Sequence, residues 1–142
     1  TPAFFAYETG TAQVIATATT TLLQMSSEDF DTDSCYDNTA TNYKFTPDVA
    51  GKYFFYASNT WDSNFGTDQS KYGGLSIIKN GSTTIANQNA REYYPITRVS
   101  VIEDMNGSSD YVQCYVNHNY GSNRTLYSLK AVQSFFGFRI IE

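Results

Sequence analysis

The 142-residue sequence has few charged residues, only 16% of the total, and this scarcity excludes several classes of protein. Nine lysines and arginines against fourteen acids give a net charge of −5, and the basic residues stand singly. A nucleic-acid-binding domain needs a basic patch that neutralises phosphates, so we expect no nucleic-acid partner. At 41%, apolar residues are too abundant for a disordered acidic tail.

Long apolar runs are also absent. No run approaches the roughly 18 apolar residues of a transmembrane helix, so we expect no membrane insertion. No long segment has apolar residues at positions i, i+3, i+4 and i+7, as an amphipathic helix would. The single histidine, His118, disfavours a histidine-ligated metal centre, and no Gly-x-Ser-x-Gly nucleophile elbow accompanies it. We therefore expect a protein that is not an enzyme, and we interpret His118 as a surface-loop residue.

Aromatic residues are abundant instead: twelve tyrosines, ten phenylalanines and one tryptophan make up 16% of the chain. They occur in short β-branched and aromatic runs separated by turn residues at intervals of about 8–12 residues, which is typical of a β-sandwich or barrel. We predict one domain, residues 1–142, with a loop at 26–41 and another at 59–74. The predicted strands cover residues 3–7, 13–25, 42–46, 52–58, 75–79, 83–87, 96–102, 111–118, 125–132 and 134–141. Asn80-Gly81 predicts a tight hairpin, because both positions tolerate a positive φ.

Four stretches resemble the C1q and tumour-necrosis-factor-like globular head family. They are Pro2-Ala3-Phe4, the run from Tyr43-Lys44-Phe45-Thr46-Pro47 through Gly51 to Phe54-Phe55, Ile77-Ile78-Lys79-Asn80-Gly81, and Ser134-Phe135-Phe136-Gly137-Phe138-Arg139-Ile140. One departure is the turn Gly107-Ser108-Ser109-Asp110, which is two residues longer than the family's Gly-Asp turn. The resemblance covers essentially the whole chain, in order.

The resemblance implies an all-β, two-sheet antiparallel jelly roll of about ten strands that assembles as a homotrimer. The residues favour the same assembly. The runs at 53–57 and 134–138 are apolar on both faces, so both faces need to be covered. One small core has little room for so many aromatics, and aromatics are enriched at subunit contacts. A heterologous three-fold ring is one closed arrangement that would bury them.

Loop residues are our candidates for recognition, since aromatic faces stack on sugar rings and neighbouring polar groups hydrogen-bond hydroxyls. The alternative is that these aromatics cover the sandwich edges or fill the trimer interface. The candidate binding residues are Trp61, Asp62, Asn64, Tyr72, Tyr93, Tyr94, Tyr120 and Asn123.

An acidic segment suggests a calcium site, with Asp29, Asp31 and Asp33 as the candidate ligands, because calcium takes several carboxylate oxygens. The pattern departs from an EF-hand, since Ser34 stands at the glycine position and Ala40 at the position of the bidentate glutamate. The alternative is a solvated acidic loop, and no other cofactor is expected.

The two cysteines allow a disulfide without requiring one. Cys114 alternates with valines and is interpreted as a small buried apolar residue. Cys35 lies in the acidic loop, where nearby carboxylates disfavour a thiolate.

We therefore expect the trimeric head of a viral fibre or spike, such as a phage tail fibre, at the virion surface. It would follow a stalk as the C-terminal part of a longer fibrous protein and bind a host-cell glycan or protein. The alternatives are a purely structural trimerisation or decoration domain of a virion, a secreted or bacterial surface C1q-domain protein, and a glycan hydrolase. The low-charge composition rich in Thr, Asn, Gly and Tyr favours the viral surface.

Overall fold

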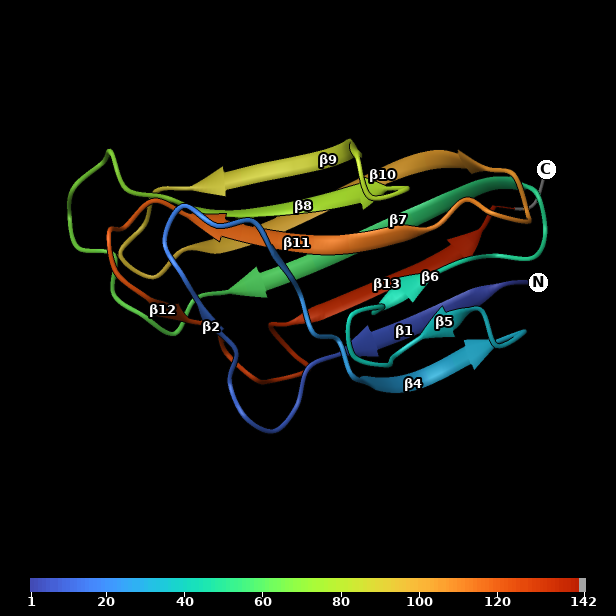
Figure 1. Cartoon of the computed structure of the whole chain (residues 1–142), viewed down its shortest axis with the longest axis horizontal. Coiled ribbons are helices and arrows are strands. Elements are labelled where there is room, and N and C mark those ends of the chain that lie inside the picture. Colours follow the sequence, from blue (N-terminus) through green and yellow to red (C-terminus); the bar gives the residue numbers. More distant parts are fainter. Residues whose placement is uncertain (141–142) are drawn as a thin grey trace.

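The computed structural model describes residues 1–140, which form thirteen strands in two stacked layers and contain no helix (Figure 1). The predicted all-β fold class is therefore confirmed. Since this part of the chain is built of strands and loops, it offers no helix long and apolar enough to span a membrane.

The first sheet has five antiparallel strands in the order β10–β7–β13–β1–β4. Its centre is β7 paired with β13, the two segments predicted to be apolar on both faces. Their register places Phe54 opposite Phe138 and Tyr56 opposite Phe136. The strand bounds are β1 Ala3–Tyr7, β4 Ser27–Thr32, β7 Gly51–Thr60, β10 Ile96–Met105 and β13 Ser134–Arg139.

The second sheet follows the order β5–β6–β11–β8–β9, with β3 paired to β11, and it packs across the core from the first. A separate pair, β2 with β12, lies at one end of the sandwich. The bounds are β2 Val14–Ile15, β3 Thr21–Leu22, β5 Tyr36–Asp37, β6 Lys44–Phe45, β8 Gly73–Lys79, β9 Thr83–Ala90, β11 Val112–His118 and β12 Arg124–Thr125.

The core is formed by alternate residues of both sheets and is rich in stacked rings. The Phe4 ring lies 4.4 Å from that of Phe45 and 5.0 Å from that of Tyr36, centroid to centroid. Cys114 is 1% exposed between its neighbouring valines, as the alternation predicted. Burial of such aromatic side chains is the main stabilising contribution in a fold of this size.

The β8–β9 hairpin forms where the sequence predicts it. Asn80 and Gly81 have φ values of 54° and 72°. A side-chain oxygen of Asn80 also accepts the Tyr111 backbone N–H at 3.0 Å, which joins this turn to the start of β11.

Three predictions of local structure are wrong. The acidic segment 26–41 contains β4 and β5 rather than a loop alone, because β4 pairs with the edge of β1. In the run 13–25, Ile15 is buried whereas Val14 is 56% exposed, so the alternating set starting at Val14 faces outward. Of the predicted strand 125–132, only the first residue is in a strand.

The predicted last strand, 134–141, forms as far as Arg139, and Ile141 lies outside the described residues.

Candidate functional site

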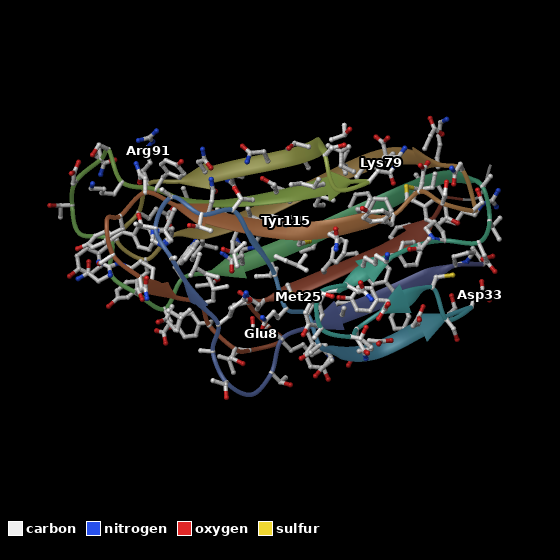
Figure 2. All side chains as sticks on the ribbon, viewed as in Figure 1. Glu8, Met25, Asp33, Lys79, Arg91 and Tyr115 are labelled. Carbon is white, nitrogen blue, oxygen red and sulfur yellow. The ribbon has the colours of Figure 1, made fainter. Side chains whose placement is uncertain are left out.

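Three loops gather at one end of the sandwich, which we call the distal end. They connect β7 to β8 (61–72), β9 to β10 (91–95) and β11 to β12 (119–123). The distal end is at the left of Figure 1, whereas the N-terminus and the end of β13 are at the right. Figure 2 marks the two ends with the labelled side chains of Arg91 and Asp33. All eight predicted binding residues lie in these loops; seven are at the surface or half-buried, and Trp61 is buried.

Backbone hydrogen bonds join the three loops to one another. The Phe65 N–H donates to the Tyr93 carbonyl at 2.7 Å, and the Trp61 N–H donates to the Pro95 carbonyl at 3.0 Å. The Tyr72 N–H donates to the side-chain oxygen of Asn119 at 2.8 Å. The chain therefore presents the distal residues on a fixed backbone, which lowers the entropy cost of binding.

Two adjacent tyrosines form the most exposed aromatic surface of the distal end. Tyr93 and Tyr94 are 50% and 48% exposed, and their rings meet edge to face with centroids 5.2 Å apart. The Asn64 side-chain amide donates to the Tyr93 hydroxyl. Nearby, the negative charge of Asp62 and a hydrogen bond with it raise the pKa of Tyr127. We call Asp62, Asn64, Tyr93, Tyr94 and Tyr127 the distal tyrosine cluster.

Two arginines that the sequence did not single out cover two of the predicted tyrosines. The Arg124 guanidinium lies 3.2 Å from the centroid of the Tyr120 ring, and its Nη1 donates to the Asn123 carbonyl at 2.7 Å. The Arg91 guanidinium lies 5.7 Å from the centroid of the Tyr72 ring. Tyr72 and Tyr120 are therefore half-buried supports of the loops, and the exposed members are Tyr93 and Tyr94.

The prediction that Trp61 binds a ligand is wrong, because its side chain is completely buried. Trp61 continues the inward alternation of β7 and forms a bridge with Leu126. Its ring packs edge-on against Phe65 and His118, at centroid distances of 5.4 and 5.2 Å. The tryptophan therefore supports the loops from below.

The prediction that His118 is a surface residue is also wrong, since it is 1% exposed. Its Nδ1 accepts the Tyr120 backbone N–H at 3.2 Å, which requires a proton on Nε2 facing the Ile15 carbonyl at 2.9 Å. Burial lowers the pKa of His118, so the ring is neutral near pH 7. Both ring nitrogens serve the backbone, and His118 has a structural role.

The predicted calcium ligands Asp29, Asp31 and Asp33 do not converge on one point. Asp31 accepts two backbone N–H groups of the following turn at 3.0 and 2.9 Å. Asp29 forms an ion pair with Lys130, and an Asp33 carboxylate oxygen lies 3.3 Å from the backbone nitrogen of Thr1. Within residues 1–140, no three His, Cys, Asp or Glu side chains lie close enough to hold a metal ion together.

The two cysteines are free and buried, so they form no disulfide with each other. Burial raises the pKa of both thiols, and a carboxylate beside Cys35 adds to this effect. Neither cysteine is therefore a nucleophile at neutral pH.

A second surface of interest is the outer side of the first sheet, which carries one continuous array of rings. The ring centroid of Phe136 lies 5.5 Å from that of Phe5 and 5.0 Å from that of Tyr56. At the margins, Phe30 and Phe138 are 49% and 44% exposed. Contiguous exposed apolar side chains of this kind often mark a contact with another protein. This aromatic face consists of Phe5, Tyr7, Phe30, Phe54, Tyr56, Ile102, Phe136 and Phe138.

A groove of about 370 Å³ runs along the open side of the sandwich, between edge strands β9 and β10. Ile85, Gln88, Arg98 and Val99 are among its lining residues. The Arg98 backbone N–H donates to the side chain of Gln88 at 2.7 Å, which links the two sheets at this edge.

Comparison with protein-family models and with curated proteins finds no match to this chain. Solved structures do match over nearly its whole length. Murine APRIL superposes with a TM-score of 0.71 at 8% identity, covering 98% of each chain. The globular domain of the zebrafish complement 1qA protein has a TM-score of 0.64 at 15% identity, covering 100% of this chain and 99% of its own. Eiger TNF from S. frugiperda has a TM-score of 0.65 at 7% identity, with 99% and 92% covered. The jelly-roll fold expected from the four sequence stretches is therefore confirmed.

Proposed function

We propose that this chain is the trimeric, receptor-binding head of a fibre or spike on a virus, most simply a phage. Three copies would associate through the aromatic face, join a stalk at the end that holds the N-terminus, and present their distal loops to a host-cell surface. The aromatic face is the single observation that carries this proposal. A virion surface is the proposed location.

The aromatic face supports a stable assembly because its rings lie outside the core of the single chain. Burying one exposed phenylalanine contributes about 1.5–3 kcal/mol, and the aromatic face includes several partly exposed rings. A closed ring needs two different patches on each copy. The edge formed by β9 and β10, with its groove, is the proposed second patch.

The distal end supports receptor binding because its loops are fixed to the core and carry exposed tyrosines. Tyrosine offers a large contact area at low entropy cost. Three copies around one axis would present three identical sites, so that weak single contacts gain avidity.

A secreted or cell-surface ligand of an animal or a bacterium is the second candidate. The likeness of the fold to murine APRIL and to the zebrafish complement domain favours it. The low-charge composition favours the virion, and a purely structural decoration domain would leave the distal tyrosines without a role.

An enzymatic role has the least support. Glycoside hydrolysis needs two carboxyl groups facing across a cleft. The adjacent acids Glu103 and Asp104 instead pair with two different lysines, Lys79 and Lys52, each at 3.0 Å. Successive strand residues point to opposite sides of the sheet, so these two carboxyls do not face each other.

The test of the proposal is the mass in solution, followed by cell binding. Light scattering is expected to give three times the chain mass of 15.9 kDa. The labelled trimer is then incubated with a panel of intact bacteria and animal cells, where saturable binding to some of them is expected. A monomer at micromolar concentration would contradict the assembly, and a trimer that binds no cell would favour the purely structural role.

A further inference from the structure

The distal tyrosine cluster has the geometry of a sugar-stacking platform. The rings of Tyr93 and Tyr94 are half exposed and lie in a five-residue loop between two long strands. Hydrogen bonds to the buried Trp61 and Phe65 segment hold the backbone of that loop in place. A ring fixed in this way stacks on the apolar face of a pyranose without first having to be ordered.

Polar groups suited to sugar hydroxyls surround the rings. Asp62 offers carboxylate oxygens that accept hydrogen bonds. The Asn64 amide keeps one N–H and one lone pair beyond its bonds to the Tyr93 hydroxyl and the Gly66 N–H. The Asn64 side-chain amide donates to the Tyr93 hydroxyl, which fixes the position of that hydroxyl. Asp62 lies close enough to Tyr127 for its charge to raise the pKa of the Tyr127 hydroxyl. A few placed polar groups beside an aromatic surface give a site both orientation and selectivity.

The carboxylate of Asp62 is the group of the distal tyrosine cluster that selects against acidic ligands. Asp62 belongs to the cluster, and Glu92 is the residue next to Tyr93. The guanidinium groups of Arg91 and Arg124 keep their positive charge, but they lie over the rings of Tyr72 and Tyr120. They donate to the Gln69 and Asn123 carbonyls, each at 2.7 Å. A sialic acid or sulfate on the rings would meet a carboxylate, and like charges across an interface weaken binding.

We propose that the distal tyrosine cluster binds an uncharged glycan, through stacking on Tyr93 and Tyr94 and hydrogen bonds to Asp62 and Asn64, and discriminates against sialylated and sulfated sugars. This inference rests on the proposed receptor-binding function and names the class of its ligand.

The experiment uses an array of immobilised oligosaccharides in matched sets: each neutral glycan beside its sialylated and its sulfated form. The labelled protein is expected to bind one or more neutral glycans at least about tenfold more tightly than their acidic counterparts. Tyr94→Ala is expected to lower that affinity about tenfold, the loss of one stacking contact. Tyr115→Ala, which removes a tyrosine from the outer face of the second sheet, is the matched control and is expected to change nothing.

Asp62→Asn tests the selectivity directly. Removing the carboxylate charge is expected to raise the ratio of acidic to neutral glycan bound, even where total binding falls. An unchanged ratio would show that Asp62 does not exclude acidic sugars and would overturn that part of the inference.

The remaining outcomes separate this inference from the proposed function. Preference for sialylated or sulfated glycans, or equal loss in Tyr94→Ala and Tyr115→Ala, overturns the inference and leaves a receptor-binding head in place. If no glycan binds but cell binding is abolished by protease treatment of the cells, the receptor is a protein and the inference fails. Failure to bind any cell or glycan overturns both.

Discussion

The two outer faces of this sandwich differ in chemistry although they enclose one core. The outward positions of β7 and β13 carry phenylalanine and tyrosine, whereas the second sheet is mostly polar on its outer side. A strand with apolar side chains on both faces must be buried on both faces. A strand in which apolar and polar side chains alternate needs to be buried on one face only. The outward residues of the second sheet include Ser76, Asn87, Asn89, Gln113, Tyr115 and Asn117. The comparison teaches that polar groups on the second sheet are met by water or, as at Gln113, by hydrogen bonds to a neighbouring segment. We propose that further copies of the chain cover the aromatic face of the first sheet.

The sharpest test of this difference places one charge on each face. Phe138→Asp would bury a carboxylate in the trimer contact, at a cost of about 3–5 kcal/mol per subunit. Since Phe138 is 44% exposed in the single chain, the fold is expected to survive. Light scattering is expected to show a drop from trimer to monomer with the β-type circular dichroism unchanged.

Tyr115→Asp is the matched variant on the polar face. Tyr115 lies opposite Leu22 and Ser76 in the second sheet, away from the aromatic face, so its replacement is expected to leave the mass unaltered. Loss of the trimer in Tyr115→Asp, or its retention in Phe138→Asp, would mean that the aromatic face is not the subunit contact.

Two glycines allow the core and the polar face to be compared with the same substitution. A Cβ on Gly137 would lie 2.5 Å from a ring carbon of Phe55 and 3.0 Å from the Phe54 carbonyl oxygen. Neither atom has room to move, so Gly137→Ala is expected to lower the free energy of unfolding by about 2–3 kcal/mol. Urea denaturation measures the change.

Gly74→Ala meets softer neighbours. Its Cβ would lie 2.3 and 2.5 Å from the side-chain oxygens of Asn117 and Asn89, which are ends of side chains that can turn toward water. The expected loss is below about 1 kcal/mol. Equal losses in the two variants would mean that the amides over Gly74 are as rigid as the core.

The inner face of the first sheet itself changes from apolar to polar toward the distal end. In β1 the inward series Phe4 and Ala6 continues to Glu8, which is 3% exposed. Gln133, completely buried, donates to Glu8 Oε2 at 3.0 Å. Burial raises the pKa of Glu8 from 4.5 to about 7, although hydrogen bonds from Gln133 and Gln13 act in the opposite direction.

A carboxyl with a raised pKa stabilises the fold in acid and less so in base. Stability due to Glu8 is fully present below pH 4.5 and is lost as the pH rises through about 7, by about 3 kcal/mol in all. Glu8→Gln keeps a hydrogen-bonding group beside Gln133 and is expected to remove this slope, making the variant more stable than wild type at pH 8. His118 acts in the opposite sense, since its lowered pKa costs stability as the pH falls below 6.5, but it is common to both proteins. Urea midpoints at pH 5 and pH 8 measure the difference, and parallel pH curves would contradict it.

The sequence was sufficient to predict which residues of an alternating strand face the core and where the tight turn forms. It was not sufficient to predict the burial of residues at the ends of strands. The Asn80-Gly81 hairpin and the buried Cys114 follow from short patterns that tertiary contacts do not override. Trp61 and His118 were misjudged because both continue the inward alternation at the end of a strand: Trp61 directly follows β7, and His118 is the last residue of β11. Whether a residue at such a border is buried depends on partners distant in sequence, here the segments around Tyr93 and Ile15.

The location of the candidate site in the loops could be predicted from the sequence, but only some of its residues could. Loop tyrosines beside polar residues located the distal end, and Tyr93 and Tyr94 are indeed exposed there. Arg91 and Arg124, which cover Tyr72 and Tyr120, could not be found, because a single arginine carries no pattern in the sequence. The acidic strand β4 was missed for a related reason, since its pairing with β1 is a long-range contact.

The smallest expected effect concerns β4, the edge strand beside the aromatic face, where calcium was the predicted partner of Asp29, Asp31 and Asp33. In the structure Lys130 occupies this role for Asp29, and its Nζ also lies 5.5 and 5.2 Å from the ring centroids of Phe5 and Tyr7. A side-chain cation already balances the acid at this margin, so excess EDTA is expected to leave both the mass and the melting temperature unaltered. Dissociation on chelation would reverse the argument: the three carboxylates would then have to rearrange around an ion, and the aromatic face would depend on metal as well as on apolar contact.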